Sequence, residues 1–184
     1  MGIEPSMVTR PLRAVLFDRD GTLVKDVPYN GDPALVEPMP TARAATELLR
    51  RNGIAIGVIT NQSGVARGLL SPADVAAVNE RIDELLGPID VWAICPHGAE
   101  EGCGCRKPAP GLVNRALRTL GLRAADAVVI GDIGADMGAA RAAGAGGVLV
   151  PTPMTRLEEV RDAPLVAATV LAAVELVLAA EVVS

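Results

Sequence analysis

The stretch AVLFDRDGTL, residues 14–23, joins four apolar residues to a polar turn that contains Asp18 and Asp20. A short apolar run bounded by turn residues is typical of a buried strand. Three later apolar runs end in the same way: IAIGVI leads into TNQSG (residues 60–64), VWAI into a cysteine-rich loop (residues 95–105), and AVVI into Gly131-Asp132. This repetition indicates a parallel sheet whose strands bring polar side chains to one shared edge.

The alternation of apolar runs and helix signals predicts an α/β fold, with helices on both faces of the parallel sheet. The predicted strands are residues 14–17, 54–60, 91–94, 127–130 and 147–150. The predicted helices run from a cap at Thr41 to Gly53, from a Ser71–Asp74 capping box to Gly87, from Gly111 to Gly121 and from Ala135 to Gly144. Residues 1–184 are expected to form a single domain, with residues 1–12 as a flexible lead-in.

Composition limits the classes of partner. The chain has 184 residues, a net charge of −5 and three aromatic residues, so aliphatic side chains and alanine must fill its core. Clustered basic and aromatic residues, which a nucleic-acid groove requires, are not visible, and no nucleic-acid partner is expected. The N-terminus lacks the apolar run of a secretory signal, so we expect a cytoplasmic protein, which we take to be a monomer.

The apolar C-terminal stretch LVAATVLAAVELVLAAEVVS, residues 165–184, raises the question of a membrane span. It contains Glu175 and Glu181, has no basic flank and offers a helix start at Thr169. A spanning helix needs about 20 apolar residues with few or no charges. The stretch is therefore predicted to form a buried strand followed by a packed helix, and no membrane contact is expected.

The polar residues that follow the predicted strands form a set suited to phosphoryl transfer. Asp18, Asp20 and Asp132 are like charges that need a cation between them, and oxygen ligands of this kind suit Mg²⁺. One carboxylate can attack phosphorus, and a second can protonate the leaving alkoxide and then activate water. The Thr60 hydroxyl and the Lys107 ammonium can hold the phosphoryl oxygens.

All three cysteines and the only histidine lie within ICPHGAEEGCGCRKP, residues 94–108. The four side chains Cys95, His97, Cys103 and Cys105 make a complete Cys₃His set for tetrahedral zinc. A disulfide suits an odd number of cysteines in a cytosolic protein poorly. We therefore predict a structural zinc-binding loop over residues 95–108, called the cysteine loop below, that fixes the basic residues at its end over the magnesium crevice.

Together, DRDGTL, TNQSG, CRKPAPG and GDIGAD resemble the four motifs of the haloacid dehalogenase (HAD) superfamily of phosphatases, over about residues 14–150. The resemblance implies that Asp18 is the nucleophile, Asp20 the general acid and base, and Thr60 and Lys107 the phosphate holders. It also implies that Asp18, the main-chain carbonyl of Asp20 and Asp132 bind Mg²⁺, and that Asp136 supports the magnesium shell or Lys107. The segment between Asp20 and Thr60 is too short for a cap domain, so a capless HAD-like fold is expected.

Within this superfamily, TNQSGVARG and the CPH…C-x-C-R-K-P loop resemble the D-glycero-D-manno-heptose 1,7-bisphosphate 7-phosphatases. The resemblance implies a small phosphorylated metabolite as substrate, cleaved at C7 and contacted by these residues: Asp26, Tyr29, Thr60, Asn61, Gln62, Ser63, Arg106 and Lys107. Two features depart from the heptose enzymes: a short loop with Gly98 in place of a second histidine, and Ile133 in place of a lysine. These departures leave histidinol-phosphate phosphatases open as an alternative. A non-catalytic interaction module built on the zinc loop also stays open, because a fold does not by itself guarantee activity.

Overall fold

The computed structural model describes residues 11–182. The first ten residues of the predicted flexible lead-in, residues 1–12, lie outside this range. Its last residue, Leu12, is wrongly included, because the Leu12 side chain is buried against the core.

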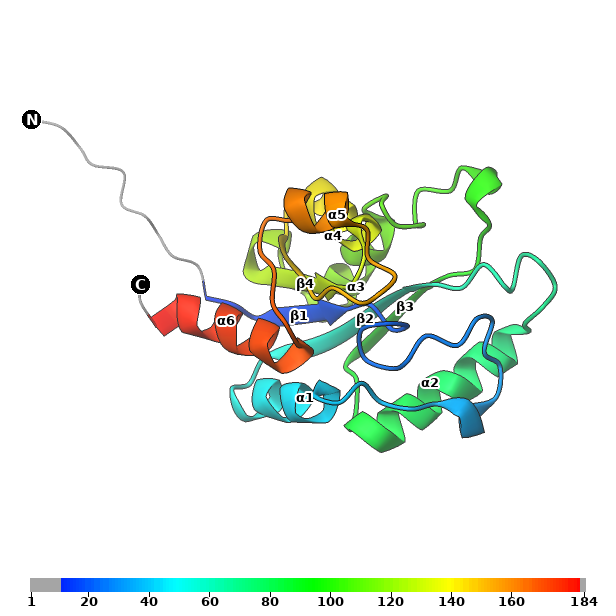
Figure 1. The fold of residues 1–184 in the computed structure, drawn as a ribbon, viewed down its shortest axis with the longest axis horizontal. Helices are drawn as coiled ribbons and strands as arrows, with labels where there is room; N and C mark the ends of the chain where they lie inside the picture. Colours follow the sequence, from blue (N-terminus) through cyan, green and yellow to red (C-terminus); the bar gives the residue numbers. More distant parts are fainter. Residues whose placement is uncertain (1–10, 183–184) are drawn as a thin grey trace, which may run out of the picture.

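A five-stranded parallel sheet forms the centre of the molecule, in the order β3-β2-β1-β4-β5 (Figure 1). The strands are β1 (Ala14–Phe17), β2 (Ala55–Asn61), β3 (Val91–Cys95), β4 (Ala127–Gly131) and β5 (Gly146–Leu149). All five predicted strands are confirmed to within one residue at each end. The strand order reverses direction between β1 and β4, which makes the carboxyl ends of these two strands the switch point where ligands bind in such sheets.

Six α-helices and three short 3-10 helices connect the described strands. The α-helices are α1 (Ala42–Arg51), α2 (Pro72–Leu86), α3 (Gly111–Leu120), α4 (Gly134–Ala143), α5 (Leu157–Asp162) and α6 (Val170–Val182). The 3-10 helices are η1 (Pro33–Leu35), η2 (Ala99–Glu101) and η3 (Ala124–Asp126). The four predicted helices are confirmed as α1 to α4. Only η1 and α1 lie between β1 and β2, as expected for a capless crevice.

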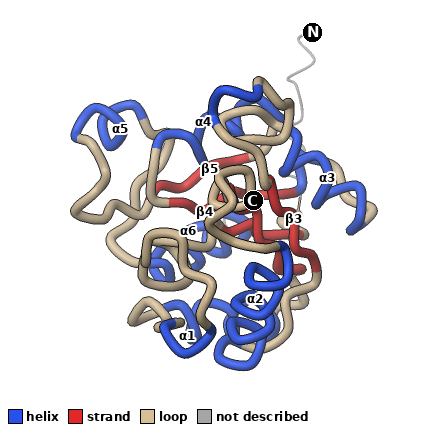
Figure 2. The backbone as a smooth tube through the Cα atoms, turned by 90° about the vertical axis from the view of Figure 1, so that its right-hand side faces the viewer, coloured by secondary structure: helices blue, strands red, loops and turns tan. Residues whose placement is uncertain are grey.

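The helices form two layers around the sheet. Figure 2 shows the strands between a layer of α1, α2 and α6 and a layer of α3, α4 and α5. Alternate residues of β1 explain this sandwich, because Val15 and Phe17 belong to the core under the first layer while Ala14 and Leu16 belong to the core under the second. A strand buried on both faces needs apolar side chains at every position, which is what the AVLF run supplies.

The helix caps are partly as predicted. Ser71 and Asp74 form the predicted capping box of α2, in which the Ser71 hydroxyl accepts from the Asp74 N–H at 3.1 Å. Thr41 occupies the N-cap position of α1, as predicted, but its hydroxyl makes no capping bond to that helix. It accepts instead from the backbone N–H of Leu171 at 3.2 Å, in the first turn of α6. Thr41 thus ties α6 to the start of α1.

The C-terminal stretch contains the predicted helix but not the predicted strand. Thr169 directly precedes α6, and its hydroxyl accepts from the Ala172 N–H at 3.1 Å, in the first turn of the helix. The segment before it makes only an isolated bridge between Val166 and Leu149 at the edge of the sheet, and the Val166 side chain is exposed. Within residues 11–182, no helix combines the length and the apolar character that crossing a membrane requires.

Candidate active site

Lys107 lies at the centre of a buried ion-pair cluster. Its Nζ atom is 2.6 Å from Asp18 Oδ1 and 2.7 Å from Asp136 Oδ1, and it donates to the Ile59 carbonyl at 2.8 Å. Burial alone would lower the Lys107 pKa, but the charges of Asp136 and Asp18 raise it above its ordinary value. The ammonium is therefore charged, and three acceptors fix its position.

Asp18 and Asp132 follow β1 and β4 at the switch point, as the sequence predicts. Burial raises the pKa of Asp18 to about 6; Lys107 opposes this increase and Asp136 adds to it. Burial, followed by the charges of Asp18 and Asp136, raises the pKa of Asp132 to about 8. The single charge of Lys107 lowers both pKa values but does not offset burial and the neighbouring carboxylates, so a second positive charge is needed to keep the cluster ionised.

A magnesium ion would supply that charge. One carboxylate oxygen from each of Asp18, Asp132 and Asp136 can be chosen so that all lie within 4.8 Å of one another. An all-oxygen set of buried carboxylates is the donor chemistry that Mg²⁺ takes in proteins. Both oxygens of Asp136 already have partners, because Oδ1 pairs with Lys107 and Oδ2 accepts from the Ile133 N–H at 3.3 Å. The pair of Asp18 with Lys107 uses only Oδ1, so the residues that fit the ion best are Asp18 and Asp132.

Gly21 explains how the turn after β1 comes so close to Asp132. Its φ angle of +85° lies in the left-handed region that favours glycine, and a Cβ atom at this position would collide with the Asp132 carboxylate. The glycine in DRDGTL therefore brings the Asp18–Asp20 turn against the loop after β4.

Asp20 is held by two neighbouring side chains. The Arg19 guanidinium donates from Nε to both Asp20 carboxylate oxygens, at 3.1 and 3.0 Å. The Gln62 amide donates to Asp20 Oδ2 at 2.9 Å and to the Thr60 hydroxyl at 2.8 Å. Burial raises the pKa of Asp20, and the charge of Arg19 opposes this rise. The predicted acid-base residue and the predicted phosphate holder Thr60 are thus linked through Gln62.

The cysteine loop is anchored to the end of β2 at both of its ends. Near the start of the loop, the Gln62 N–H donates to the Cys95 carbonyl at 2.7 Å. At its end, the Asn61 side chain accepts from the Lys107 N–H at 3.1 Å and donates to the Lys107 carbonyl at 3.3 Å. Asn61 therefore holds the backbone that carries Lys107, a role that the sequence did not indicate.

The side chains of Cys95, His97, Cys103 and Cys105 gather in one cluster. Five of the separations among their sulfur and Nδ1 atoms fall between 3.1 and 3.6 Å. A tetrahedron around zinc with bonds of about 2.0–2.3 Å has edges of about 3.3–3.8 Å. The predicted ligand set thus has close to the spacing that zinc requires.

Ionisation of the thiols in this cluster is uneven. Burial, helped by a hydrogen bond with Cys105, raises the pKa of Cys95 to about 12. Burial acts in the same direction on Cys103, but the backbone N–H of Arg106 and other donors bring its pKa down to about 7. Thiolates packed this closely repel one another, which a bound cation would relieve.

The predicted substrate-contacting residues occupy different environments. Gln62 is buried within the hydrogen bonds described above, whereas Asp26 and Tyr29 are exposed. Partial burial and the charge of Asp20 raise the pKa of Asp26, which indicates that Asp26 lies close to Asp20. Tyr29 has a φ angle of 52°, and the Arg67 guanidinium lies 5.8 Å from its ring centroid. Arg106 donates to the His97 carbonyl at 3.3 Å, which ties it to the cysteine loop.

A support for Asp132 was missed at the sequence level. The loop after β5 returns to the switch point, where the Thr155 hydroxyl donates to the Asp132 carbonyl at 2.6 Å. The Glu159 carboxylate accepts from the Gly134 N–H, at the start of α4, at 3.0 Å. Helix α5 was not predicted, so no sequence pattern placed either residue near the crevice.

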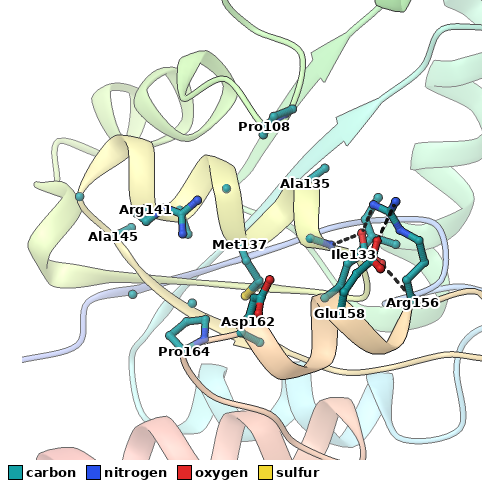
Figure 3. A pocket seen from close by; sticks show the side chains of 18 residues that line it. Pro108, Ile133, Ala135, Met137, Arg141, Ala145, Arg156, Glu158, Asp162 and Pro164 are labelled. Atoms are coloured by element: carbon teal, nitrogen blue, oxygen red, sulfur yellow. Dashed lines mark hydrogen bonds and ion pairs between the residues drawn. The ribbon is translucent and has the colours of Figure 1, made fainter.

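A groove between α4 and α5, with a volume of about 1040 Å³, lies behind this loop (Figure 3). Its wall includes Arg156, which pairs with Glu158 at 3.2 Å and with Glu159 at 3.0 Å. It also includes Met137 and Pro164. Asp18, Asp20 and Lys107 do not line this groove, so it is separate from the carboxylate cluster.

Comparison with known proteins gives consistent matches. A family model described as HAD-hydrolase-like matches residues 104–175. The chain is similar to a D-glycero-beta-D-manno-heptose-1,7-bisphosphate 7-phosphatase of Vibrio cholerae, with 35% identity over 174 residues that cover 82% of this chain and 94% of the relative. An enzyme of the same name from Pseudomonas aeruginosa is 35% identical over 143 residues, covering 75% and 80% of the two chains.

Among solved structures, a D,D-heptose 1,7-bisphosphate phosphatase from B. bronchiseptica, complexed with magnesium and phosphate, superimposes with a TM-score of 0.80. The sequence identity is 28%, and the match covers 91% of this chain and 99% of the other. The similarity therefore extends over nearly the whole of both chains.

Proposed function

Because this chain belongs to the HAD-like phosphatase family that includes the D-glycero-D-manno-heptose 1,7-bisphosphate 7-phosphatases, we propose that it hydrolyses that sugar bisphosphate at C7. The protein is a phosphoric monoester hydrolase with an HAD-like fold. The observation that carries the proposal is the buried cluster at the switch point, where Lys107 lies between Asp18 and Asp136 and beside Asp132.

In the first step, an oxygen of the Asp18 carboxylate attacks phosphorus and the bond from phosphorus to the sugar oxygen breaks. The pKa of about 6 leaves Asp18 mostly ionised at neutral pH, as a nucleophile must be. Protonated Asp20 gives its proton to the departing alkoxide, which leaves as the C7 alcohol. Lys107 and the Thr60 hydroxyl hold the phosphoryl oxygens as negative charge shifts onto them.

In the second step, the Asp20 carboxylate takes a proton from water while the water oxygen attacks phosphorus. The bond between phosphorus and Asp18 breaks, which releases inorganic phosphate and restores the Asp18 carboxylate. Asp20 is left protonated and ready for the next cycle. The net reaction consumes one water and yields the alcohol and phosphate.

Two metals complete the proposal. Mg²⁺ would be held by Asp18, the Asp20 carbonyl and Asp132. When bound, this ion would neutralise the negative charge of the phosphate. Cys95, His97, Cys103 and Cys105 would hold a structural zinc that keeps the cysteine loop in place. This role is supported by the bonds that join the loop to β2 and by the position of Lys107 at its end. That the chain forms a single domain, is monomeric and is cytoplasmic stays a prediction.

Arg106 is proposed to recognise the sugar bisphosphate. It lies next to Lys107, and its planar guanidinium can bind phosphate oxygens in pairs. Within the described part of the chain, its side chain makes a single hydrogen bond, from Nη1 to the His97 carbonyl. Histidinol phosphate would require a carboxylate for its amine, and the Glu101 carboxylate already accepts from the Gly98 N–H at 2.6 Å. Glu101 is therefore less available to an amine, while Arg106 beside Lys107 suits a second phosphate.

The test is a comparison of kcat/KM for heptose 1,7-bisphosphate and histidinol phosphate. We expect the heptose compound to lead by at least about tenfold, equivalent to about 1.4 kcal/mol of transition-state discrimination. Arg106→Ala should lose much of this lead, and Arg106→Lys should recover only part of it, because lysine keeps the charge without the planar fork. A higher kcat/KM for histidinol phosphate would overturn the proposed substrate and leave the proposed phosphatase chemistry in place.

A further inference from the structure

Arg19 is the largest side chain that is almost fully buried in the described part of the chain, with 1% of its surface exposed. Arg19 lies between Asp18 and Asp20 in the turn after β1, and no step of the reaction described above uses it. Its Nε donates to both oxygens of Asp20, and its Nη2 atom lies 3.0 Å from Asp20 Oδ2. Its Nη1 atom donates to the Asn79 side-chain oxygen at 3.0 Å.

Asn79 anchors this contact in the core. It lies on α2, sixty positions further along the chain, and only 6% of it is exposed. Arg19 thus forms a bridge from a rigid helix to the Asp20 carboxylate. Gln62, which directly follows β2, donates to the same carboxylate, so Asp20 is held from the end of β2 as well as from α2.

Stability alone does not account for this arrangement. A buried ion pair seldom stabilises a protein more than apolar side chains of similar size would, because both charges lose their hydration. A guanidinium with a fork of donors does, however, fix the orientation of the carboxylate that it binds. Proton transfer depends on such an orientation, since the acid must lie within hydrogen-bond reach of the atom that receives the proton.

We propose that Arg19, anchored by Asn79, is a positioning residue that holds the Asp20 carboxyl group in line with the leaving oxygen of the substrate. The proposal rests on the acid-base role of Asp20. As the bond from phosphorus to the leaving oxygen breaks, the proton passes from Asp20 to that oxygen. Arg19 itself gives up no proton and does not touch the substrate.

The test uses two phosphate esters of matched shape, p-nitrophenyl phosphate and phenyl phosphate. The p-nitrophenolate ion departs without being protonated, whereas the phenolate ion depends more on an acid. The readout is kcat/KM for each ester, which reports the steps up to the first irreversible one and so excludes hydrolysis of the phosphorylated enzyme. Loss of a positioned acid must lower the value for phenyl phosphate more than the value for p-nitrophenyl phosphate.

We expect Arg19→Met to lower kcat/KM for phenyl phosphate about tenfold more than for p-nitrophenyl phosphate, a part of the 10²–10⁴-fold effect that a general acid supplies. Asn79→Ala should shift the same ratio in the same direction by about threefold, because it removes only the anchor. If Arg19→Met does not fold, Asn79→Ala decides the outcome, since it leaves the ion pair intact.

Thr46→Val is the matched control. The buried Thr46 hydroxyl donates to the Leu86 carbonyl at the end of α2, and no contact with Arg19 is made. This variant should lower thermal stability without changing the ratio of the two esters. Equal losses on both esters in Arg19→Met and Asn79→Ala, or no loss, would overturn the positioning role.

Asp20→Asn separates this inference from the function on which it rests. It should shift the ester ratio further than Arg19→Met does. A shift in Asp20→Asn without one in the Arg19 and Asn79 variants overturns the role of Arg19 alone. No shift in Asp20→Asn overturns the acid role of Asp20 and the role of Arg19 with it.

Discussion

Raising the pH should destabilise the protein when zinc is retained and Mg²⁺ is left out of the buffer. Asp132 has a pKa of about 8 in the folded protein, against an ordinary value of 3.8. A carboxyl group whose pKa is higher in the folded than in the unfolded state favours folding below the unfolded value. That advantage is lost as the pH rises toward the folded value, because the unfolded chain gives up its proton first.

The size of the effect follows from the shift. Each pKa unit corresponds to about 1.4 kcal/mol, so an ideal titration of Asp132 would remove about 4 kcal/mol of unfolding free energy between about pH 5 and pH 9. Water reaches part of this carboxylate at the open crevice, and we expect about 2 kcal/mol. Asp18, with a pKa of about 6, should add to the loss at the lower end of this range.

The assay is urea unfolding at several pH values, with and without millimolar Mg²⁺ and without a chelator, so that zinc stays bound. Without Mg²⁺, the unfolding free energy of the wild type should fall with pH, and that of Asp132→Asn should fall much less. Added Mg²⁺ should stabilise the wild type more at high than at low pH, because the ion competes with protons for the carboxylates. The reasoning would be refuted if, without Mg²⁺, the unfolding free energy of the wild type did not fall more with increasing pH than that of Asp132→Asn.

Three other changes test separate parts of the site. The purified protein should contain one zinc per chain by elemental analysis, and its removal should lower the melting temperature; native protein without zinc and with freely titrating thiols would contradict this. Asp136→Asn should cost about 2 kcal/mol in urea unfolding, because Lys107 loses one of its two buried counter-charges; unchanged stability would show that the pair contributes little. Gly21→Ala should weaken Mg²⁺ binding measured by calorimetry, because its methyl group would displace Asp132, and a normal affinity would argue against this close contact.

The positions of the proposed catalytic residues could be predicted because these residues follow apolar runs. Asp18, Thr60 and Asp132 lie at or just after the carboxyl ends of β1, β2 and β4, and a parallel sheet brings such ends to one edge without further information. The four side chains of the predicted zinc site are close in sequence, so their clustering required only a turn between them. Local pattern was sufficient for both.

Contacts that depend on packing between distant segments could not be predicted. Arg19 meets Asn79 across sixty positions, and Thr41 meets Leu171 across 130. Neither pair carries a local signal, because the partner is chosen by how α2 and α6 pack on the sheet. Thr155 was missed for the same reason: its bond to Asp132 depends on a loop that returns from the edge of the sheet.

The most direct test of the central claim is phosphate release from heptose 1,7-bisphosphate by the wild type and by Asp18→Asn, with the sugar product identified by phosphorus NMR. The wild type should release the C7 phosphate and leave the 1-phosphate. Asp18→Asn should keep its fold and its zinc but lose turnover by about a thousandfold or more, since asparagine lacks the charge of the nucleophile. Release of the C1 phosphate, or substantial turnover by Asp18→Asn, would contradict the account.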